Sequence, residues 1–221
     1  MRHFVQQHLS GDYAVWREMK LLLRLLSPVR AVLERVNTRR YRQAILDRLV
    51  PLLADGARIL DVGCDDGALS AALMRRKASL RIVGADVQQH RPARIAKVIA
   101  DGRYLPFADA AFDVALAVDV LHHTPDILSV LREMNRVAGS QVLIKDHVWN
   151  GLGFSWLLLS LCDWCTNAPY GIGCAYNYPT LARWLAYFSS VRLRCRVAMP
   201  VAHFPWHLNE KYNRIFHLEK S

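Results

Sequence analysis

The sequence of 221 residues has no apolar run long enough to cross a membrane as a helix. Such a helix needs about 20 consecutive apolar residues, and the longest candidate, LGFSWLLLSLCDWC, is interrupted at Asp163. The first residues, MRHFVQQHLSGDY, also lack the apolar core of a secretory signal peptide. With five cysteines and no secretory signal, we expect reduced thiols and a cytoplasmic protein.

Glycine is missing where a phosphate-binding loop needs it. The segment ILDVGCDDGAL, residues 59–69, is typical of a strand, a tight turn and a helix, as in a nucleotide-binding corner. A dinucleotide loop requires G-x-G-x-x-G, but counting from Gly63 the later glycines are replaced by Asp65 and Ala68. The Gly-Lys-Ser/Thr of a P-loop is also absent. Because Asp65 would repel a phosphate, this corner predicts a cofactor without one.

The cysteines do not form a zinc-binding pattern. Cys162 and Cys165 make one C-x-x-C, but no second C-x-x-C accompanies it, and the pair falls in a predicted helix. We therefore expect no metal site in this protein.

Acidic residues are scarce in both flanks of the chain. The sequence carries 29 Lys and Arg against 19 Asp and Glu, a net charge of +10. Residues 1–50 hold ten basic and four acidic residues, residues 51–146 hold twelve of each, and residues 147–221 hold seven and three. Basic flanks suit an acidic substrate, an anionic membrane surface, nucleic acid or simply a solvated surface. Charge alone leaves these alternatives open.

The first quarter of the chain has helical periodicity. In residues 15–36 apolar side chains recur at helical spacing, and Pro28 splits or kinks the helix; the apolar stripe comprises Trp16, Met19, Leu22, Leu23 and Leu26. A second helix is predicted from about residue 39 to residue 53. We expect residues 1–54 to form an N-terminal helical cap. The same basic, amphipathic helices also suit peripheral contact with a membrane.

From residue 55 onward, short β-rich runs replace this pattern. RILDV, RIVGADV, KVIA, FDVALAV and QVLIKD alternate in part with helical ALSAALMRR and DILSVLREMNRV, which predicts parallel βαβ units. Helices are expected near residues 154–166 and 179–188, and VRLRCRVAM with YNRIFHLE predicts a closing antiparallel pair. The expected fold is an α/β, Rossmann-like three-layer sandwich around a mostly parallel seven-stranded sheet. Residues 55–221 form its domain, with residues 146–190 on the substrate side.

Acidic residues follow several of these predicted strands. Asp86 ends the second strand, 25 residues beyond Asp61, at about the spacing of a carboxylate that binds ribose hydroxyls. Asp101 and Asp119 follow the third and fourth strands. The carboxyl ends of parallel strands share one edge of the sheet, where ligands bind in such folds. Carboxylates there attract a cation, and S-adenosylmethionine is cationic and has no phosphate.

Four segments in order carry a resemblance to a known family. They are LDVGCDDG, GADV, ADGRYLPFADAAFD and DVLHHTPD, spread over residues 60–126. Together, residues 58 to about 146 resemble a class I S-adenosylmethionine-dependent methyltransferase, with the pattern of the ubiquinone/menaquinone-biosynthesis subgroup. The departure is Asp65, where this family usually has glycine.

The resemblance implies S-adenosylmethionine as cofactor and gives roles to particular residues. Residues of the first motif would shape the methionine end of the pocket: Asp61, Gly63, Cys64 and Gly67. Asp86 would bind the ribose and Val87 would lie against the adenine. Asp101 would lie near the adenine amino group with Gly102 beside it, and Asp119 would border the reactive end. Asp101 and Asp119 also suit plain turn caps.

The acceptor is expected to be a small, apolar or aromatic molecule, such as a quinone or lipid precursor. The chain lacks the Asp/Asn-Pro-Pro-aromatic motif of amino-methylating nucleic-acid enzymes, so nucleic acid is not the expected partner. His147, next to Asp146 at a strand end, is the candidate general base, although it also suits a packing role. His122 and His123 are expected to shape the site. Two alternatives stay open, a non-catalytic S-adenosylmethionine-binding scaffold and an RNA methyltransferase.

Overall fold

The computed structural model of the protein describes residues 39–89, 92–167, 175–201 and 212–221. The chain divides into two compact units, Met1–Tyr41 and Arg42–Ser221. The expected N-terminal cap lies mostly in the first unit and outside the described residues, so its role and the predicted boundary at residue 54 stay predictions. Everything described below belongs to the second unit.

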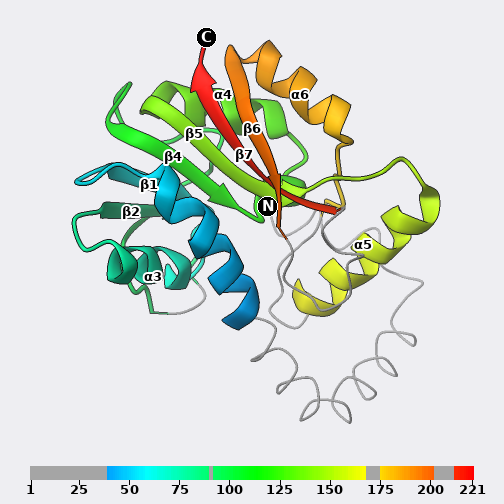
Figure 1. The fold of residues 1–221 in the computed structure, drawn as a ribbon, viewed down its shortest axis with the longest axis horizontal. Coiled ribbons are helices and arrows are strands. Elements are labelled where there is room, and N and C mark those ends of the chain that lie inside the picture. Colours follow the sequence, from blue (N-terminus) through cyan, green and yellow to red (C-terminus); the bar gives the residue numbers. More distant parts are fainter. Residues whose placement is uncertain (1–38, 90–91, 168–174, 202–211) are drawn as a thin grey trace, which may run out of the picture. The chain divides into compact units, whose positions relative to one another are not determined.

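The second unit is built on one seven-stranded sheet, as the sequence predicts (Figure 1). Its strands are β1 (Arg58–Val62), β2 (Arg81–Asp86), β3 (Ala96–Ile99), β4 (Phe112–Val118), β5 (Ala138–His147), β6 (Leu193–Pro200) and β7 (Asn213–Lys220). The order is β3-β2-β1-β4-β5-β7-β6. The pairs from β3 to β5 are parallel, and β7 pairs antiparallel with β5 and β6. The predicted closing antiparallel pair is confirmed.

Helices connect the strands and cover the sheet. They are α3 (Ala68–Arg76), α4 (Ile127–Val137), α5 (Gly153–Asn167) and α6 (Leu181–Ser190), with the short 3-10 turns η1 (Val50–Leu52) and η2 (Leu121–His123). Residues 42–49 are also helical and lead into η1. β1, α3 and β4 have the predicted bounds, because RILDV, ALSAALMRR and FDVALAV are strong local patterns.

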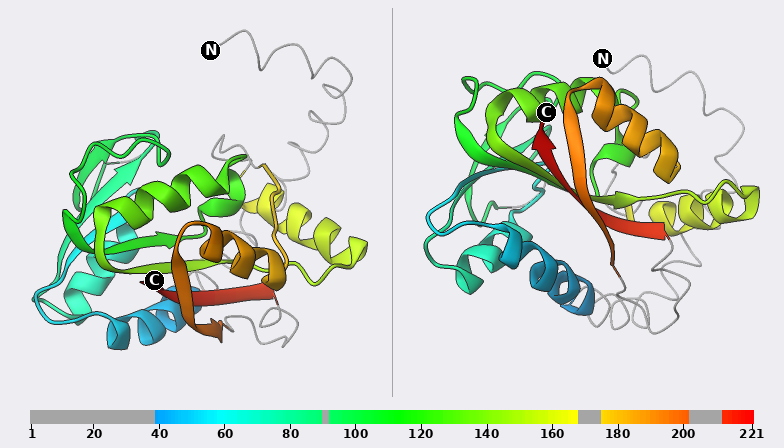
Figure 2. Two further views of the ribbon diagram at one scale, coloured as in Figure 1. Left: turned by 90° about the horizontal axis from the view of Figure 1, so that it is seen from above. Right: turned by 45° about the horizontal axis from the view of Figure 1, so that its top comes forward.

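Both faces of the sheet are buried. On one face, alternate strand residues join α4 and α6 in a single core; these strand residues include Leu60, Val62, Ala115, Ala117, Val142, Ile144, Phe216 and Leu218. The intervening side chains point to the other face and are equally buried, among them Ile59, Leu116 and Leu143. α3 and the helix of residues 42–49 lie on that side (Figures 1 and 2). Burial on both faces explains the nearly continuous apolar runs of the central strands.

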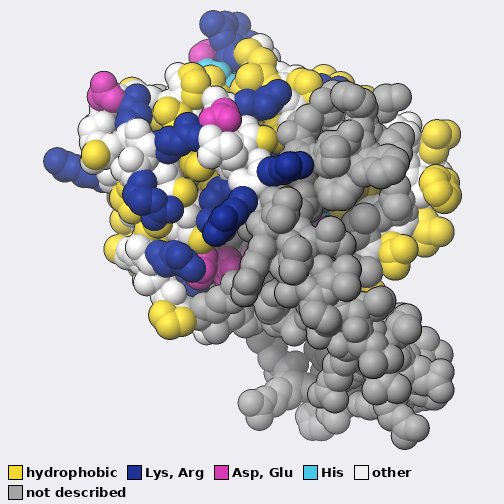
Figure 3. Space-filling model, turned by 60° about the horizontal axis from the view of Figure 1, so that its bottom comes forward, with side chains coloured by type: hydrophobic (Ala, Val, Ile, Leu, Met, Phe, Trp, Pro, Cys, Tyr) yellow, Lys and Arg dark blue, Asp and Glu magenta, His cyan; other side chains and the backbone are white. Residues whose placement is uncertain are grey.

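Exposed apolar side chains gather on α5 and just before it. Those of Leu152, Phe154, Trp156, Leu157 and Leu161 are exposed. Figure 3 shows hydrophobic side chains along the edge of the molecule where α5 lies. Within the residues that the structure describes, no helix has the length and hydropathy of a membrane span.

Candidate active site

An open cavity of about 490 Å³ lies at the carboxyl edge of the parallel strands. Its size falls within the range of roughly 300 to 1,000 Å³ that is usual for small-molecule sites. The cavity lies between β1 and β4. The chain continues from β1 to β2 on one side of the sheet and from β4 to β5 on the other, and sheets of this kind bind ligands at such a switch point. Its wall comprises Val62, Gly63, Asp65, Ala85, Asp86, Val87, Gln88, Ala100, Asp101, Gly102, Arg103, Val118, Asp119, Val120, His123, Thr124, Pro125 and Val130.

The turn after β1 forms one side of the cavity. Gly63, Asp65 and Gly67 have φ values of 73°, 48° and 72°, so this turn uses the left-handed region three times. A Cβ on Gly63 would stand 2.4 Å from Cγ2 of Val120, which closes the position to any larger residue. Asp65 adopts the left-handed conformation that Asp tolerates better than most residues, and the chain therefore keeps the turn without the usual glycine.

Asp86 connects the end of β2 to this turn. Its Oδ2 accepts a hydrogen bond of 2.8 Å from the Asp65 backbone N–H, and its Oδ1 accepts one of 3.2 Å from the Gln88 N–H. Lys97 Nζ also donates to the Asp65 carbonyl oxygen at 2.8 Å. The Asp86 carboxylate thus belongs to the cavity wall and fixes the neighbouring loop at the same time.

The other two predicted carboxylates of the wall are paired with basic side chains. Asp101 Oδ2 accepts from Arg103 Nη2 at 2.6 Å, and this pair lowers the pKa of Asp101. Asp119 pairs with Lys145, whose side chain is fully buried and also donates to Asn213 Oδ1 at 2.6 Å. Sequence reasoning did not single out Lys145 and Asn213 as partners of Asp119. The one sequence signal for this buried ion pair was a lysine within the apolar strand QVLIKD.

The remaining residues of the first motif lie behind the wall. Asp61 is buried and its Oδ2 accepts a hydrogen bond of 2.6 Å from Ser70 Oγ. Cys64 is buried, and its Sγ occupies the space that a Cβ on Gly84 would need. Gly67 is the N-cap of α3. These three residues support the turn from behind, and their direct contact with a cofactor stays a prediction.

Burial changes the acidity of Asp61. Desolvation raises the pKa of its carboxyl to about 7, with a smaller contribution from the negative charge of Asp86, although the Ser70 hydrogen bond opposes this. The native state therefore holds a proton on Asp61 that the unfolded chain has already released above pH 3.8. Stability then falls as the pH rises from about 4 to 7, because the native state binds more protons across this window.

Asp61→Asn is expected to remove this pH dependence. Its free energy of unfolding should match that of the unsubstituted protein at pH 4 and exceed it by about 2–4 kcal/mol at pH 8, since Asn cannot ionise. Urea unfolding at the two pH values measures the difference. Asp113→Asn is the control, because Asp113 forms an exposed ion pair with Arg58 and its pKa is lowered. Parallel stability curves for Asp61→Asn and the unsubstituted chain would contradict the raised pKa.

A second polar cluster, formed by histidines and aspartates, adjoins the cavity. His122 is buried in η2, and its Nδ1 lies 2.6 Å from Asp146 Oδ1. Asp146 also accepts from the backbone N–H groups of Leu121 at 2.9 Å and His147 at 2.7 Å. Burial by itself would lower the pKa of His122, but the Asp146 and Asp163 carboxylates raise it. The pKa of Asp146 is lowered by His122 and His147 against the opposing effect of burial.

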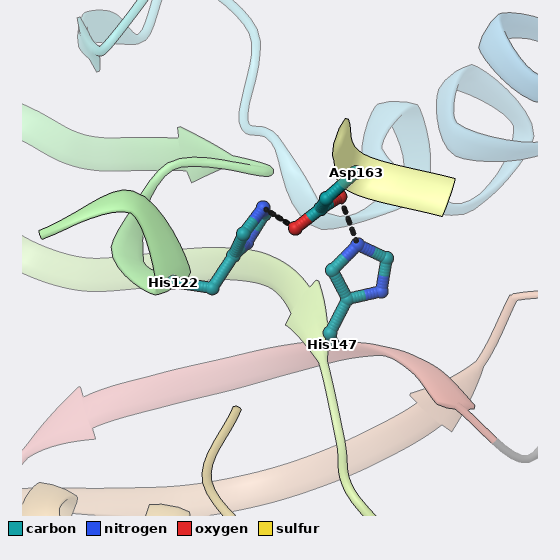
Figure 4. Close-up of side chains that lie close together, drawn as sticks. All are labelled: His122, His147 and Asp163. Carbon is teal, nitrogen blue, oxygen red and sulfur yellow. Dashed lines mark ion pairs between the residues drawn. The ribbon is translucent and has the colours of Figure 1, made fainter. Parts of the chain in front are cut away.

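Asp163 of α5 joins the two imidazoles (Figure 4). Its Oδ2 lies 3.3 Å from His122 Nε2, and its Oδ1 lies 3.6 Å from His147 Nε2. The Tyr178 hydroxyl donates to Asp163 Oδ2 at 2.5 Å. His147 is half-buried and does not belong to the cavity wall; within the described residues its Nδ1 has no hydrogen-bond partner. Its role as a base stays a prediction.

His123 is the histidine that the cavity wall contains. Its ring centroid lies 4.1 Å from that of His122. Burial lowers the pKa of His123, and the positive charge of His122 lowers it further, so His123 is neutral near pH 7. The sequence predicts only a shaping role for both histidines of the HH pair. No local sequence pattern tells which of the two histidines is buried and which one lines the cavity.

The aromatic side chains of the substrate region serve different purposes. Trp184 is fully buried against Phe188 and Phe216, and its Nε1 donates to the His147 carbonyl oxygen at 2.8 Å. Core packing therefore accounts for Trp184. Tyr178 instead contacts the Asp163 carboxylate, so the polar cluster requires residues from both sides of the undescribed segment 168–174.

The geometry defines a Rossmann-like α/β protein with a cavity, lined in part by carboxylates, at the switch point of its sheet. Residues 33–188 match the family described as a methyltransferase domain, and the chain belongs to this family.

One relative and two solved structures illustrate the likeness. 27-O-demethylrifamycin SV methyltransferase of Amycolatopsis mediterranei is 33% identical over 136 residues, which cover 53% of this chain and 47% of that protein. Geranyl diphosphate C-methyltransferase of Streptomyces coelicolor has a TM-score of 0.58 at 15% identity, covering 75% of this chain and 73% of that chain. The [4+2]-cyclase SpnF has a TM-score of 0.57 at 18% identity, covering 79% and 80%. The chain spans about half the length of the curated relatives it matches.

Proposed function

We propose that this protein transfers a methyl group from S-adenosylmethionine to a small molecule. The observation that carries the proposal is the cavity, lined in part by carboxylates, at the switch point of a methyltransferase-family sheet. Asp65 and Asp86 bring carboxylates to this wall, while those of Asp101 and Asp119 are paired with Arg103 and Lys145. Carboxylates favour the cationic sulfonium and ammonium groups of this cofactor. A relative in this family acts on 27-O-demethylrifamycin SV, and a structural neighbour holds S-adenosylhomocysteine, according to their names.

The acceptor is proposed to be apolar or aromatic. The exposed apolar side chains of α5, including Phe154 and Leu157, lie on the same helix as Asp163, which reaches the polar cluster beside the cavity. An apolar acceptor approaching along α5 would bury this surface. A quinone or lipid precursor, as in the ubiquinone/menaquinone-biosynthesis subgroup, is one form of this acceptor.

A hydroxyl or an acidic carbon on the acceptor requires a base. The sulfonium is already an activated methyl donor, so alignment supplies much of the rate and one proton acceptor completes the chemistry. We propose His123 for this step, because its neutral imidazole forms part of the cavity wall. His147 is the alternative base from the sequence, and it lies outside the cavity wall.

A non-catalytic or differently catalytic role is the second candidate. The [4+2]-cyclase SpnF shares the fold without being named a methyltransferase, so the fold alone does not decide the reaction. Two measurements separate the candidates. Calorimetry with S-adenosylmethionine tests cofactor binding, and transfer of a labelled methyl group into host extracts tests the reaction. Binding without any labelled product across lipid, quinone and polar fractions would favour the scaffold or cyclase-like role, and labelled RNA would favour the nucleic-acid alternative.

Membrane contact is proposed through the basic N-terminal segment. Residues 1–50 carry a net charge of +6, and an amphipathic basic helix gains free energy at anionic headgroups. The full chain is expected to float with anionic vesicles at low salt and to dissociate as salt is added. Deletion of residues 1–27 should abolish flotation, whereas Phe154→Ser with Leu157→Ser tests the α5 surface separately. No flotation of the full chain at low salt would leave the N-terminal segment only its proposed role as a cap. The cytoplasmic location stays a prediction.

A further inference from the structure

We propose that His122, His147 and Asp163 form a binding site for one divalent transition-metal ion of the zinc class. The three side chains come from η2, the end of β5 and α5, and they point toward one another (Figure 4). Their donor atoms all lie within 4.8 Å of one another. Among the described residues, this is the one group of three or more such side chains that comes so close together.

The separations between the donor atoms suit a shared ion. His122 Nε2 lies 3.3 Å from Asp163 Oδ2, and His147 Nε2 lies 3.6 Å from Asp163 Oδ1. Direct charge-assisted N–H···O hydrogen bonds are shorter, at about 2.7–2.9 Å. Ligands bound tetrahedrally to zinc at about 2.0–2.1 Å stand about 3.3 Å apart. An ion of this size therefore fits between the carboxylate and each imidazole, and the imidazole nitrogens, within 4.8 Å of one another, would close around it.

Neighbouring groups orient two of the three ligands. Asp146 Oδ1 lies 2.6 Å from His122 Nδ1, which directs Nε2 of the same ring toward Asp163. The Tyr178 hydroxyl donates to Asp163 Oδ2 at 2.5 Å and holds the carboxylate in place. Carboxylate–histidine–metal arrangements of this kind recur around metal ions, since the outer carboxylate fixes the tautomer and the ring orientation. The cluster therefore has both the ligands and the outer partners of a metal site.

The donor set selects the kind of ion. Two imidazole nitrogens and one carboxylate suit Zn²⁺ and similar transition metals, whereas Mg²⁺ and Ca²⁺ prefer oxygen ligands throughout. The three ligands found among the described residues leave one tetrahedral position to fill, which in catalytic zinc sites is taken by a water or a ligand oxygen. His147 is half-buried and gives the site a route to solvent. The ring of His123 is tilted against that of His122 with their centroids 4.1 Å apart, so the ion would lie close to the cavity wall.

The test measures metal binding by the full chain, independently of methyl transfer. Chelator-treated protein is titrated with Zn²⁺, its bound metal is counted by mass spectrometry, and Co²⁺ is used as a spectroscopic probe. We expect one ion per chain and a tetrahedral Co²⁺ spectrum without thiolate charge-transfer bands. His147→Gln and Asp163→Asn should each weaken Zn²⁺ binding by more than about 100-fold, because outer-partner losses alone cost roughly 10–100-fold. Tyr178→Phe should weaken it by about 10-fold.

Two control variants separate this site from other zinc ligands of the chain. Cys162→Ser with Cys165→Ser removes the C-x-x-C, and His217→Gln removes a histidine of β7 outside the cluster. Both should keep full Zn²⁺ affinity. Cofactor binding by each variant confirms that the variant folds. If a variant does not fold, the Co²⁺ spectrum of the unsubstituted chain decides whether the ion has the proposed thiolate-free tetrahedral site. Absence of binding, thiolate bands, or loss of the ion only in the cysteine variant would overturn the proposal and leave the cluster as an ion-pair network.

Discussion

Turnover of the His123→Gln variant is expected to fall by roughly 10²-fold or more, with little change in cofactor affinity, because general-base catalysis contributes about 10²–10⁴-fold. His123 lies in the cavity wall, and burial lowers its pKa. The imidazole is then mainly neutral at neutral pH. Turnover of the unsubstituted protein should rise with pH along an acidic limb below pH 6.5, the ordinary histidine value, and the variant should lose this limb.

The matched variant is His147→Gln, which replaces the base predicted from sequence. Single-turnover rates with the true acceptor, together with calorimetry of cofactor binding, compare the two variants after both have been treated with chelator. A loss of 10²-fold or more in His147→Gln with near-normal turnover in His123→Gln, on the scale expected for a general base, would assign the role to His147. Near-normal turnover in both variants would show that alignment alone drives the transfer.

Replacement of Asp86 by alanine is expected to weaken cofactor binding by roughly 10- to 100-fold, the scale of a lost hydrogen bond to a charged group. The carboxylate has two tasks in the structure. It lies in the cavity wall, where the ribose hydroxyls would donate to it, and it accepts the Asp65 N–H at 2.8 Å. Alanine removes both, whereas Asp86→Asn keeps an acceptor for the loop and should cause a smaller loss.

Calorimetry with S-adenosylhomocysteine measures this effect without turnover. Asp113→Ala is the distant control. Asp113 pairs with Arg58 at the starts of β4 and β1, the strand ends away from the cavity, so this variant should keep the cofactor affinity of the unsubstituted protein. Unchanged affinity in Asp86→Ala would remove the ribose assignment. Equal losses in Asp86→Ala and Asp86→Asn would show that the negative charge, and not the loop contact, determines binding.

The gathering of four predicted residues in one cavity wall could be read from the sequence because its signals are local, whereas their contact with a cofactor stays a prediction. The residues Gly63, Asp86, Asp101 and Asp119 each follow a strand that the sequence pattern identifies, and the structure places all four in one cavity wall. Parallel strands share a carboxyl edge, so the strand assignment is enough to gather them. The sequence could not show that Asp61 and Cys64 lie behind the wall, because adjacent strand and turn residues point in opposite directions.

The polar cluster depended on tertiary structure. His122, His147, Asp163 and Tyr178 lie on four segments that no local pattern connects, and they meet because β5 ends beside η2 and α5 returns over that edge. The histidines of the cluster have no metal-ligand spacing along the chain, whereas the C-x-x-C of Cys162 and Cys165 is a local pattern. The sequence by itself determined the strands, the helices and the acidic strand ends, because periodicity and turn chemistry act between near neighbours. Only the tertiary structure decided which histidine lies in the cavity wall and which one contacts Asp163, because burial and long-range contacts depend on how the whole chain packs.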